Sequence, residues 1–295
     1  MNITLISENY QIIVNTLGAE LKSFQSPSGK EFIWNSDPAH WMRSSPLLFP
    51  SIGNLRNNKT MINESEYQMA KHGFCKESEF KIISNGSNYA TFSLTSNEET
   101  LKCYPYHFEL LLTYELHGNK LKMTYQVFNQ SEEMMYYHIG AHPGFMCPLE
   151  AGEAFHDYVL RFEKEEQIQS TVYDLQNLCF LSSKSYISLD NSSLLPLSAE
   201  LFDQDAIYFR HTNSRAVSLI NPVTQKGVHL AYPDFSSIAF WTPAGGNAPF
   251  LCLEPWNGAA IFDDEDDIFC HKRDIQVLKP NERATYHLEI SLLGY

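Results

Sequence analysis

Short runs in which apolar and polar residues alternate recur along the whole chain, and they constrain the fold more than any other feature. Ile3–Ile6 and Tyr10–Val14 are two such runs, joined by Glu8-Asn9, and Lys120–Asn129 and Arg283–Leu293 are two more. Alternation with a period of two places the apolar side chains on one face of a strand. Each run is therefore predicted to be a strand with one buried face.

Turn-forming residues separate these runs at intervals of roughly 8–12 residues. His117-Gly118-Asn119 predicts a hairpin between Leu110–Leu116 and Lys120–Asn129. Asn85-Gly86 predicts a tight turn in a second hairpin over Lys81–Leu94, because both residues tolerate positive φ angles. Helical periodicity over three turns is absent. The pattern predicts an all-β fold, a large and mainly antiparallel β-sandwich or barrel.

The charge balance restricts the partners of the chain. Its 21 Lys+Arg and 35 Asp+Glu give a formal net charge of −14. Binding phosphates requires a basic face, so we expect neither a nucleic acid nor an anionic membrane surface as a partner. Pro243, Gly245 and Pro249 interrupt the long uncharged stretch 235–253, so no transmembrane helix is expected there.

The cysteines indicate the compartment. Six cysteines are scattered without a CxxC pair, at positions 75, 103, 147, 179, 252 and 270. In a chain of this length that spacing is typical of reduced thiols. The first residues lack the positive and apolar regions of a secretory signal. We therefore expect a cytoplasmic protein and, because no repeat or linker is visible, a single domain over residues 1–295.

Titratable residues interrupt apolar or turn-rich sequence in three segments, Lys71–Phe74, His138–Phe145 and Leu251–Gly258. Glu254 follows an apolar run, so we expect it at the end of a buried strand that Pro255 terminates. Partial desolvation there would raise the pKa of the carboxyl group and make it a better base at neutral pH. The alternative is an ordinary surface glutamate. Trp256 offers a flat apolar face suited to stacking on a sugar ring.

His142 precedes Pro143, so its backbone is predicted to be a loop from which the ring can enter a cleft. With an ordinary pKa near 6.5, a histidine can act as a general acid or base. The alternative is a core histidine bound to a backbone carbonyl group. His72 has the same two interpretations, and His138 is interpreted as a strand residue that supports the loop.

Metal and cofactor motifs find little support. His138 and His142 would share one face of a helix, but Gly140 and Pro143 disfavour a helix there. HExxH and paired-cysteine spacings are absent, so zinc remains a minor alternative. The acidic run 263–267 lacks the spacing of an EF-hand and is predicted to be a solvated loop. Without a P-loop or GxGxxG motif, we expect no metal and no cofactor.

Several segments along nearly the whole chain carry a resemblance to a known family: Leu17–Leu21, Trp34, Pro46–Gly53, Phe202–Ile207 and the three segments above. Together they resemble the aldose 1-epimerase (galactose mutarotase) family, and within it the mutarotase-related branch that includes the LacX proteins of lactose operons. The resemblance implies a supersandwich of antiparallel sheets with an open sugar cleft. It also implies an isomerase of carbohydrate metabolism that interconverts the α and β anomers of an aldohexose.

The resemblance further implies roles for individual residues. His142 matches the general acid that protonates the ring oxygen, and Glu254 matches the general base that takes the proton of the anomeric hydroxyl group. His72 matches a histidine that holds the sugar ring near its oxygen. Asp205, with Asp203 as the alternative, aligns with an acidic residue that binds ring hydroxyl groups. Arg56 falls where the family places a sugar-binding arginine.

The alternatives concern the substrate and the activity. A related branch acts on hexose 6-phosphates and holds the phosphate with arginines, and Arg43, Arg56 and Lys71 lie near the proposed cleft segments. In the other interpretation, Arg43 pairs with a local carboxylate. A non-catalytic sugar-binding protein and a glycoside hydrolase using Glu254 with Asp205 are the remaining alternatives. We expect a monomer or a homodimer.

Overall fold

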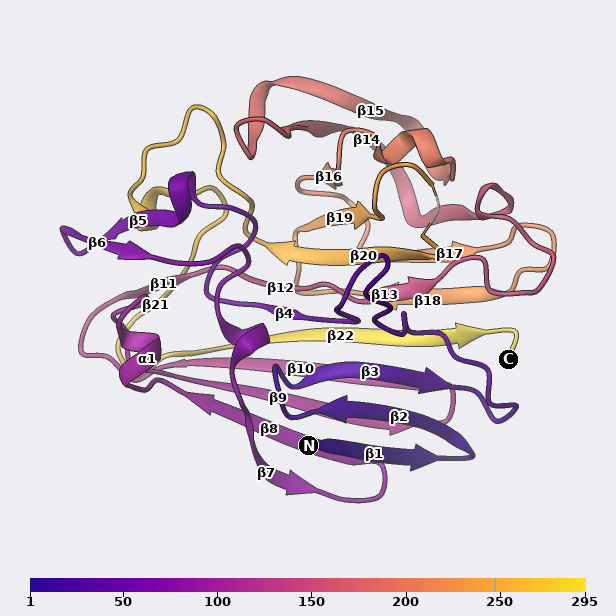
Figure 1. Ribbon diagram of the computed structural model, residues 1–295, viewed down its shortest axis with the longest axis horizontal. Helices are drawn as coiled ribbons and strands as arrows, with labels where there is room; N and C mark the ends of the chain where they lie inside the picture. Colours follow the sequence, from indigo (N-terminus) through magenta and orange to yellow (C-terminus); the bar gives the residue numbers. More distant parts are fainter. Residues whose placement is uncertain (247) are drawn as a thin grey trace.

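The computed structural model describes residues 1–246 and 248–295, and strands make up about half of this part of the chain (Figure 1). The strands are β1 (Asn2–Ser7), β2 (Tyr10–Asn15), β3 (Glu20–Gln25), β4 (Leu47–Leu48), β5 (Lys59–Ile62), β6 (Ser65–Gln68), β7 (Lys81–Asn85), β8 (Tyr89–Thr95), β9 (Phe108–His117), β10 (Lys120–Asn129), β11 (Met135–Tyr137), β12 (Ile139–Ala141), β13 (Gly144–Met146), β14 (Val159–Asp174), β15 (Cys179–Pro196), β16 (Ile207–Phe209), β17 (Ala216–Ile220), β18 (Gly227–Ala231), β19 (Ser237–Trp241), β20 (Phe250–Asn257), β21 (Gln276–Leu278) and β22 (Arg283–Leu293).

The helical segments are short: α1 (Glu98–Leu101) and the 3₁₀ turns η1 (Arg56–Asn58), η2 (Cys75–Glu77), η3 (Phe155–Asp157), η4 (Ala199–Phe202) and η5 (Phe269–His271). A capping box, in which Asn97 and Thr100 exchange hydrogen bonds, stabilises the first turn of α1. Within the described residues, no helix has the length and apolar character needed to cross a membrane.

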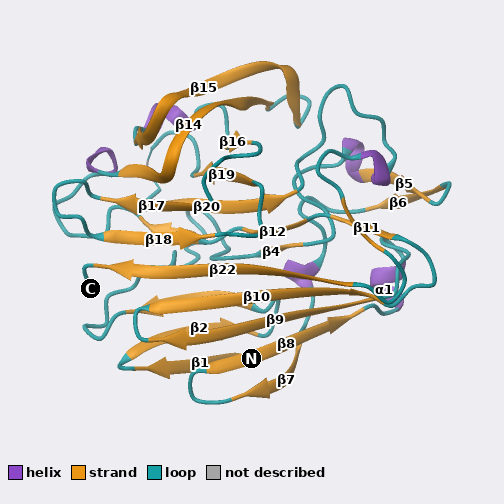
Figure 2. Cartoon of the chain, turned by 180° about the vertical axis from the view of Figure 1, so that it is seen from behind, coloured by secondary structure: helices purple, strands orange, loops and turns teal. Residues whose placement is uncertain are grey.

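One sheet of 15 strands runs through the molecule in the order β4-β12-β20-β19-β16-β14-β17-β18-β22-β10-β9-β8-β7, with β13 paired to β20 and β15 paired to β14. All strand pairs within the sheets of the described chain are antiparallel. In both views the sheet rises from β20 through β19 and β16 to β14 and then descends to β17, so that β20 and β17 lie at a similar height (Figures 1 and 2). The predicted antiparallel all-β fold is confirmed.

A second sheet of three strands, β1-β2-β3, covers one end of the large sheet (Figure 1). It packs on β8 and β9, and the hydroxyl group of Tyr114 on β9 donates a hydrogen bond of 2.6 Å to the carbonyl oxygen of Ala19. Every second residue of β9 is buried, which is the pattern expected of a strand with one face in the core. This end of the molecule is a sandwich of two packed sheets.

The hairpins confirm most of the local predictions. Glu8 and Asn9 both adopt positive φ angles between β1 and β2, and β9 pairs with β10 from His117 opposite Lys120. The hairpin of β7 and β8 differs at its turn, because the last pair is Asn85 with Ala90 and the loop between them is longer than predicted. A Cβ atom at Gly86 would lie 2.5 Å from the Tyr89 ring. Gly86 has no positive φ angle, so it does not form the predicted tight Asn-Gly turn, and a side chain at this position would displace the exposed ring of Tyr89.

Candidate active site

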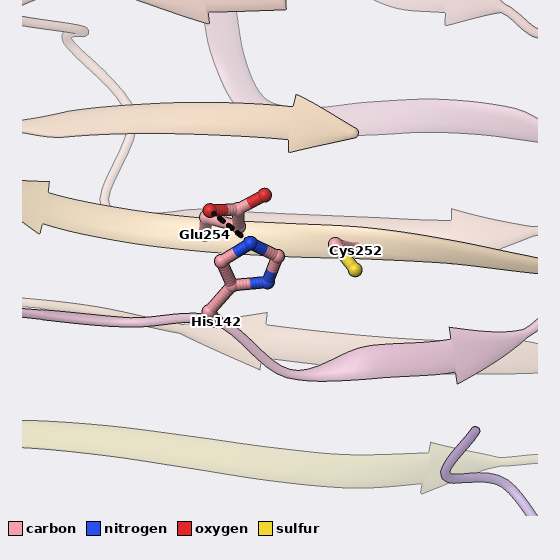
Figure 3. Close-up of side chains that lie close together, drawn as sticks. All are labelled: His142, Cys252 and Glu254. Atoms are coloured by element: carbon pink, nitrogen blue, oxygen red, sulfur yellow. Dashed lines mark ion pairs between the residues drawn. The ribbon is translucent and has the colours of Figure 1, made fainter. Parts of the chain in front are cut away.

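Strand register brings His142 and Glu254 together. The strands β12 and β13 are separated by His142 and Pro143, and both pair with β20. Gly140 pairs with Trp256, and Gly144 pairs with Cys252, so the same register places His142 opposite Glu254. Directly opposed residues of antiparallel strands have side chains within contact distance. The His142 Nε2 and Glu254 Oε2 atoms lie 3.1 Å apart, and Figure 3 shows the imidazole ring directed toward the carboxylate group.

Two glycines leave room for aromatic rings on either side of His142. A Cβ atom at Gly140 would lie 2.8 Å from Cδ1 of Trp256, and one at Gly144 would lie 3.2 Å from Cζ3 of Trp41. Since alternate residues of a strand share a face, Gly140, His142 and Gly144 form a single row. The two glycines at the ends of this row have no side chain, so His142 alone projects from it, between Trp256 and Trp41.

A cavity of about 310 Å³ lies over this row, at the lower end of the range of about 300–1,000 Å³ that is typical of small-molecule sites. Six of the seven site residues predicted from the sequence line it: Arg43, His72, His142, Asp205, Glu254 and Trp256. The segments that carry these residues lie far apart in the sequence, so the fold and not local sequence brings them together.

His72 enters the cavity from the loop between β6 and η2. Its φ angle is 64°, and Gly73 after it also has a positive φ angle. A Cβ atom at Gly73 would lie only 2.1 Å from the Phe49 carbonyl oxygen, so this approach requires glycine. The Gly53 N–H donates to His72 Nδ1 at 3.1 Å. Because Nδ1 accepts, the neutral ring carries its proton on Nε2 and can donate from there.

Asp205 is held by an aromatic residue of the same cavity. It adopts a positive φ angle of 67° before β16, and its Oδ1 atom accepts a hydrogen bond of 2.9 Å from Trp241 Nε1. Its other oxygen has no partner of this kind among the described residues and can accept from a ligand. Asp203, the alternative, is exposed on η4's C-terminal side and does not line the cavity.

Trp41 covers the ring of His142. The two rings stack with centroids 4.8 Å apart and planes inclined by 28°, while Trp241 meets His142 edge-on at 5.9 Å. The loop that carries Trp41 is fixed by the buried carboxylate of Glu20, whose Oε1 atom accepts from the N–H groups of Ser44 at 2.6 Å and Ser45 at 3.1 Å. A stacked indole face stabilises a cationic partner, so this contact favours protonated His142.

Burial drives both members of the pair toward their neutral forms. Burial lowers the pKa of His142 to about 3, with smaller contributions from Lys71 and Lys76. Burial also raises the pKa of Glu254 well above its ordinary value, and the positive charge of Lys71 opposes this rise. At pH values between these two pKa values, His142 and Glu254 together hold a single proton. Both shifts favour the arrangement in which Glu254 holds this proton, 3.1 Å from the ring nitrogen that can receive it.

The structure separates Arg56 from the other predicted residues. Arg56 Nε lies 3.1 Å from Asp267 Oδ1, and its Nη2 atom donates to the Glu265 carbonyl oxygen at 2.9 Å. The interpretation of Arg56 as a sugar-binding residue is therefore not supported by its position. Both contacts are with the acidic segment 263–267, which we predicted to be a solvated loop and which binds the guanidinium group of Arg56. Arg43 lines the cavity but also pairs with Glu77, as its alternative interpretation proposed.

His138 lies away from this cavity. Its side chain is completely buried, and its Nε2 atom lies 3.1 Å from the Arg273 carbonyl oxygen. His138 and His142 therefore do not converge on one point as a helical metal site would require. A different group of donors, His142 Nε2 or Nδ1, Cys252 Sγ and a Glu254 oxygen, lies within 4.8 Å of one another.

Sequence reasoning missed Trp41, Trp241, Lys76 and Cys252 as residues in or beside the cavity. Trp41 lies in a loop and Lys76 in the short 3₁₀ turn η2, and neither belongs to a motif, so no local signal marks them. Cys252 has a signal in retrospect, because it lies two residues before Glu254 and so shares its face of β20.

Comparison with known proteins gives consistent results. The family model described as aldose 1-epimerase matches residues 1–291. The plasmid and chromosomal LacX proteins of Lactococcus lactis subsp. lactis are each 33% identical over 308 residues, covering 100% of both chains. The structure of a galactose mutarotase related enzyme from Lactobacillus acidophilus superposes with a TM-score of 0.92 at 28% identity, covering 99% of this chain and 97% of that one. A galactose mutarotase-like protein from Lactobacillus casei ATCC 334 gives 0.90 at 26% identity, covering 99% and 100%.

Proposed function

Since the chain belongs to the aldose 1-epimerase family and is an isomerase of that type, we propose that it interconverts the α and β anomers of an aldohexose by acid–base opening and reclosure of the ring. The substrate is a small sugar, and the catalytic groups are His142 and Glu254. The reaction as proposed takes place in the cytoplasm, for which the scattered spacing of the six cysteines is the support.

The observation that carries this proposal is the pairing of an acid with a base on the wall of a sugar-sized cavity. His142 Nε2 and Glu254 Oε2 are 3.1 Å apart and both residues line the cavity. His142 Nδ1 is buried without a hydrogen-bond partner among the described residues. Buried polar atoms are normally satisfied, so this unused capacity supports the binding of a polar ligand.

Ring opening requires two proton movements at neighbouring oxygen atoms. Glu254 takes the proton from the anomeric hydroxyl group O1–H while His142 gives a proton to the ring oxygen O5, and the C1–O5 bond breaks to give the open-chain aldehyde. Rotation about C1–C2 presents the other face of the carbonyl group. O5 then attacks C1, its proton returns to His142, and Glu254 returns its proton to O1. Each positioned group typically contributes about 10²–10⁴-fold.

The single shared proton is sufficient for this cycle. The active arrangement has protonated His142 and ionised Glu254, which differs from the neutral arrangement only in which group holds the proton. The Trp41 ring stacked on His142 favours the cationic imidazole, and hydrogen bonds from sugar hydroxyl groups to Glu254 favour the carboxylate. Substrate binding therefore shifts the proton toward His142 without any exchange with solvent.

The remaining cavity residues position the sugar. Burial, together with the charges of Lys71 and His142, lowers the pKa of His72 well below its ordinary value, so its Nε2–H is a neutral donor suited to the ring oxygen. The free oxygen of Asp205 accepts from a ring hydroxyl group. Trp256, packed against Tyr208 with centroids 5.1 Å apart, presents its ring to the apolar face of the sugar.

Exchange NMR of anomer interconversion, with galactose and glucose as substrates, tests the proposal. We expect Glu254→Gln and His142→Asn each to lose about 10²–10⁴-fold of the acceleration while circular dichroism shows a folded protein. The exposed residue Asp203, changed to Asn, serves as the control and keeps the wild-type rate. Near wild-type turnover in either variant removes that residue's role. A folded wild-type protein that binds the sugars without accelerating exchange would be a sugar-binding protein.

A second candidate is the anomerisation of a hexose 6-phosphate, which the cationic side of the cavity supports. Arg43, Lys71 and Lys76 all line the cavity. Lys76 Nζ donates to the carbonyl oxygens of Lys71 at 2.6 Å and Gly73 at 3.0 Å, whereas the ammonium group of Lys71 has no ion pair or hydrogen bond to the described residues. A phosphate group would provide Lys71 with a partner of opposite charge.

The same NMR measurement decides between the two candidates. If the substrate is phosphorylated, kcat/KM for galactose 6-phosphate or glucose 6-phosphate exceeds that for the free sugar. Lys71→Met then reduces this ratio by about tenfold or more, the equivalent of one charge-assisted hydrogen bond. A ratio that Lys71→Met leaves unchanged contradicts the phosphate interpretation and leaves the free sugar as the substrate.

A further inference from the structure

Cys252 lies beside the proposed acid–base pair, and the proton transfers do not use it. It shares the face of β20 that carries Glu254 and Trp256, it is completely buried, and it packs with Trp34 and Phe250 in a small apolar cluster. One donor atom each from His142, Cys252 and Glu254 lies within 4.8 Å of the other two. Figure 3 shows Cys252 on β20 to one side of the His142 ring, which faces Glu254.

We propose that His142, Cys252 and Glu254 form a binding site for one thiophilic divalent cation, Zn²⁺ or Cd²⁺, and that the bound ion blocks anomerisation. The inhibition rests on the proposed function, whereas the binding does not. Imidazole nitrogen, thiolate sulfur and carboxylate oxygen are the ligands that Zn²⁺ takes in proteins. Three protein ligands with the fourth position open toward a cavity is an arrangement that Zn²⁺ readily accepts.

The spacing of the donors suits a tetrahedral ion. Bonds of about 2.0–2.3 Å to nitrogen, oxygen and sulfur place the donors of a tetrahedral zinc site roughly 3.3–3.8 Å apart. Donors that already lie within 4.8 Å of one another reach this geometry by side-chain shifts of about one ångström. His142 Nδ1 has no hydrogen-bond partner among the described residues, so this nitrogen can bind an ion without losing an existing bond.

The charges select for a thiophilic ion. Cys252 as a thiolate and Glu254 as a carboxylate supply two anionic ligands, which together neutralise the charge of a divalent ion. Lys71 and Lys76 also line the cavity and oppose cations in general. Mg²⁺ and Ca²⁺ require more oxygen ligands than the site offers, whereas a thiolate bond favours Zn²⁺ and Cd²⁺. Bound there, the ion occupies both groups that the ring opening needs.

Titration with Cd²⁺ tests the binding independently of activity, because a thiolate–Cd²⁺ bond produces a charge-transfer absorption band. We expect one ion per chain, a band that disappears in Cys252→Ser and a band that persists in Cys103→Ser and Cys270→Ser, whose parent cysteines are the half-exposed ones. Mg²⁺ produces no competition. A band that survives in folded Cys252→Ser, or no band in the wild type, overturns the proposed site.

Exchange NMR in the presence of Zn²⁺ tests the inhibition. We expect Zn²⁺ to abolish the acceleration, chelation with EDTA to restore it, and Cys252→Ser to require at least about tenfold more Zn²⁺ for the same effect, the loss expected at minimum for a metal site that is altered. Equal inhibition of Cys252→Ser and wild type contradicts the proposal. If the wild type shows no anomerisation, the proposed function fails, and the Cd²⁺ titration still decides the metal site.

Discussion

The proton shared by His142 and Glu254 determines the pH range in which the pair can act. Burial lowers the pKa of His142 to about 3, so a second proton enters the pair only in strong acid. The carboxyl group of Glu254 has a raised pKa, so the shared proton is lost only well above the usual range of a glutamate. A buried pair thus keeps the same proton count across neutral pH, although its two ordinary pKa values are near 4.3 and 6.5.

We therefore predict that kcat/KM for anomerisation, corrected for the uncatalysed rate at each pH, shows no inflection near pH 6.5 and stays constant within about twofold between pH 5.5 and 7.5. Exchange NMR across this range measures it, with circular dichroism to confirm that the protein is folded at each pH. A decrease with a midpoint between pH 6 and 7 would show that His142 titrates like an exposed imidazole and that burial does not control the pair.

At the scale of elements, the site depends on how β12 and β13 line up against β20. Gly140 and Gly144 occupy the two positions that flank His142 on the cavity face, and neither has an unusual φ angle. The missing side chains are therefore needed for space. A Cβ atom at Gly140 would approach Trp256 Cδ1 to 2.8 Å and Ile52 Cδ1 to 3.0 Å, whereas at Gly144 its nearest contact is 3.2 Å.

This difference predicts an order of effects for two matched substitutions. Gly140→Ala must displace the Trp256 ring, so we expect it to lower the free energy of unfolding by about 1–3 kcal/mol and to weaken sugar binding. Gly144→Ala requires shifts of only a few tenths of an ångström and should cost less on both measures. Urea denaturation and KM values from the exchange assay give the comparison. Equal or reversed costs would show that Trp256 is not held by the Gly140 contact.

Local patterns predicted the hairpins because each is determined by a few neighbouring residues. Alternation and the turn at Glu8-Asn9 are sufficient for β1 and β2, and the strand over Arg283–Leu293 has the predicted bounds. The register of β20 with β12 and β13 joins residues more than a hundred positions apart, which no local pattern specifies. The position of Arg56 could not be predicted for the same reason. Its partner Asp267 is distant in sequence, and the residues around Gly53 and Arg56 do not indicate this ion pair.

On the scale of the whole molecule, the fold favours the uncharged form of three histidines, the buried His138 and His142 and the half-buried His72. Burial lowers the pKa of His138 to about 3, and it lowers the pKa values of His72 and His142 as well. In the unfolded chain these rings bind protons near pH 6.5. Protons therefore favour the unfolded state as the pH falls below 6.5, and each such ring reduces the free energy of unfolding. Glu254, with its raised pKa, acts in the opposite direction in this range.

His138 allows this effect to be measured away from the cavity, since within the described residues its side chain makes one hydrogen bond, between Nε2 and the Arg273 carbonyl oxygen. One histidine whose pKa falls from 6.5 to about 3 on folding contributes a slope of about 1.4 kcal/mol per pH unit between these values. We predict that His138→Gln reduces the pH dependence of the unfolding free energy by about that amount between pH 6.0 and 5.0. Urea denaturation at both pH values gives the slope, and the absolute loss from the missing hydrogen bond cancels in the comparison. His156→Gln, at a side chain that is 76% exposed, keeps the wild-type slope. An unchanged slope in His138→Gln would mean that His138 binds its proton equally well in the folded and unfolded chain.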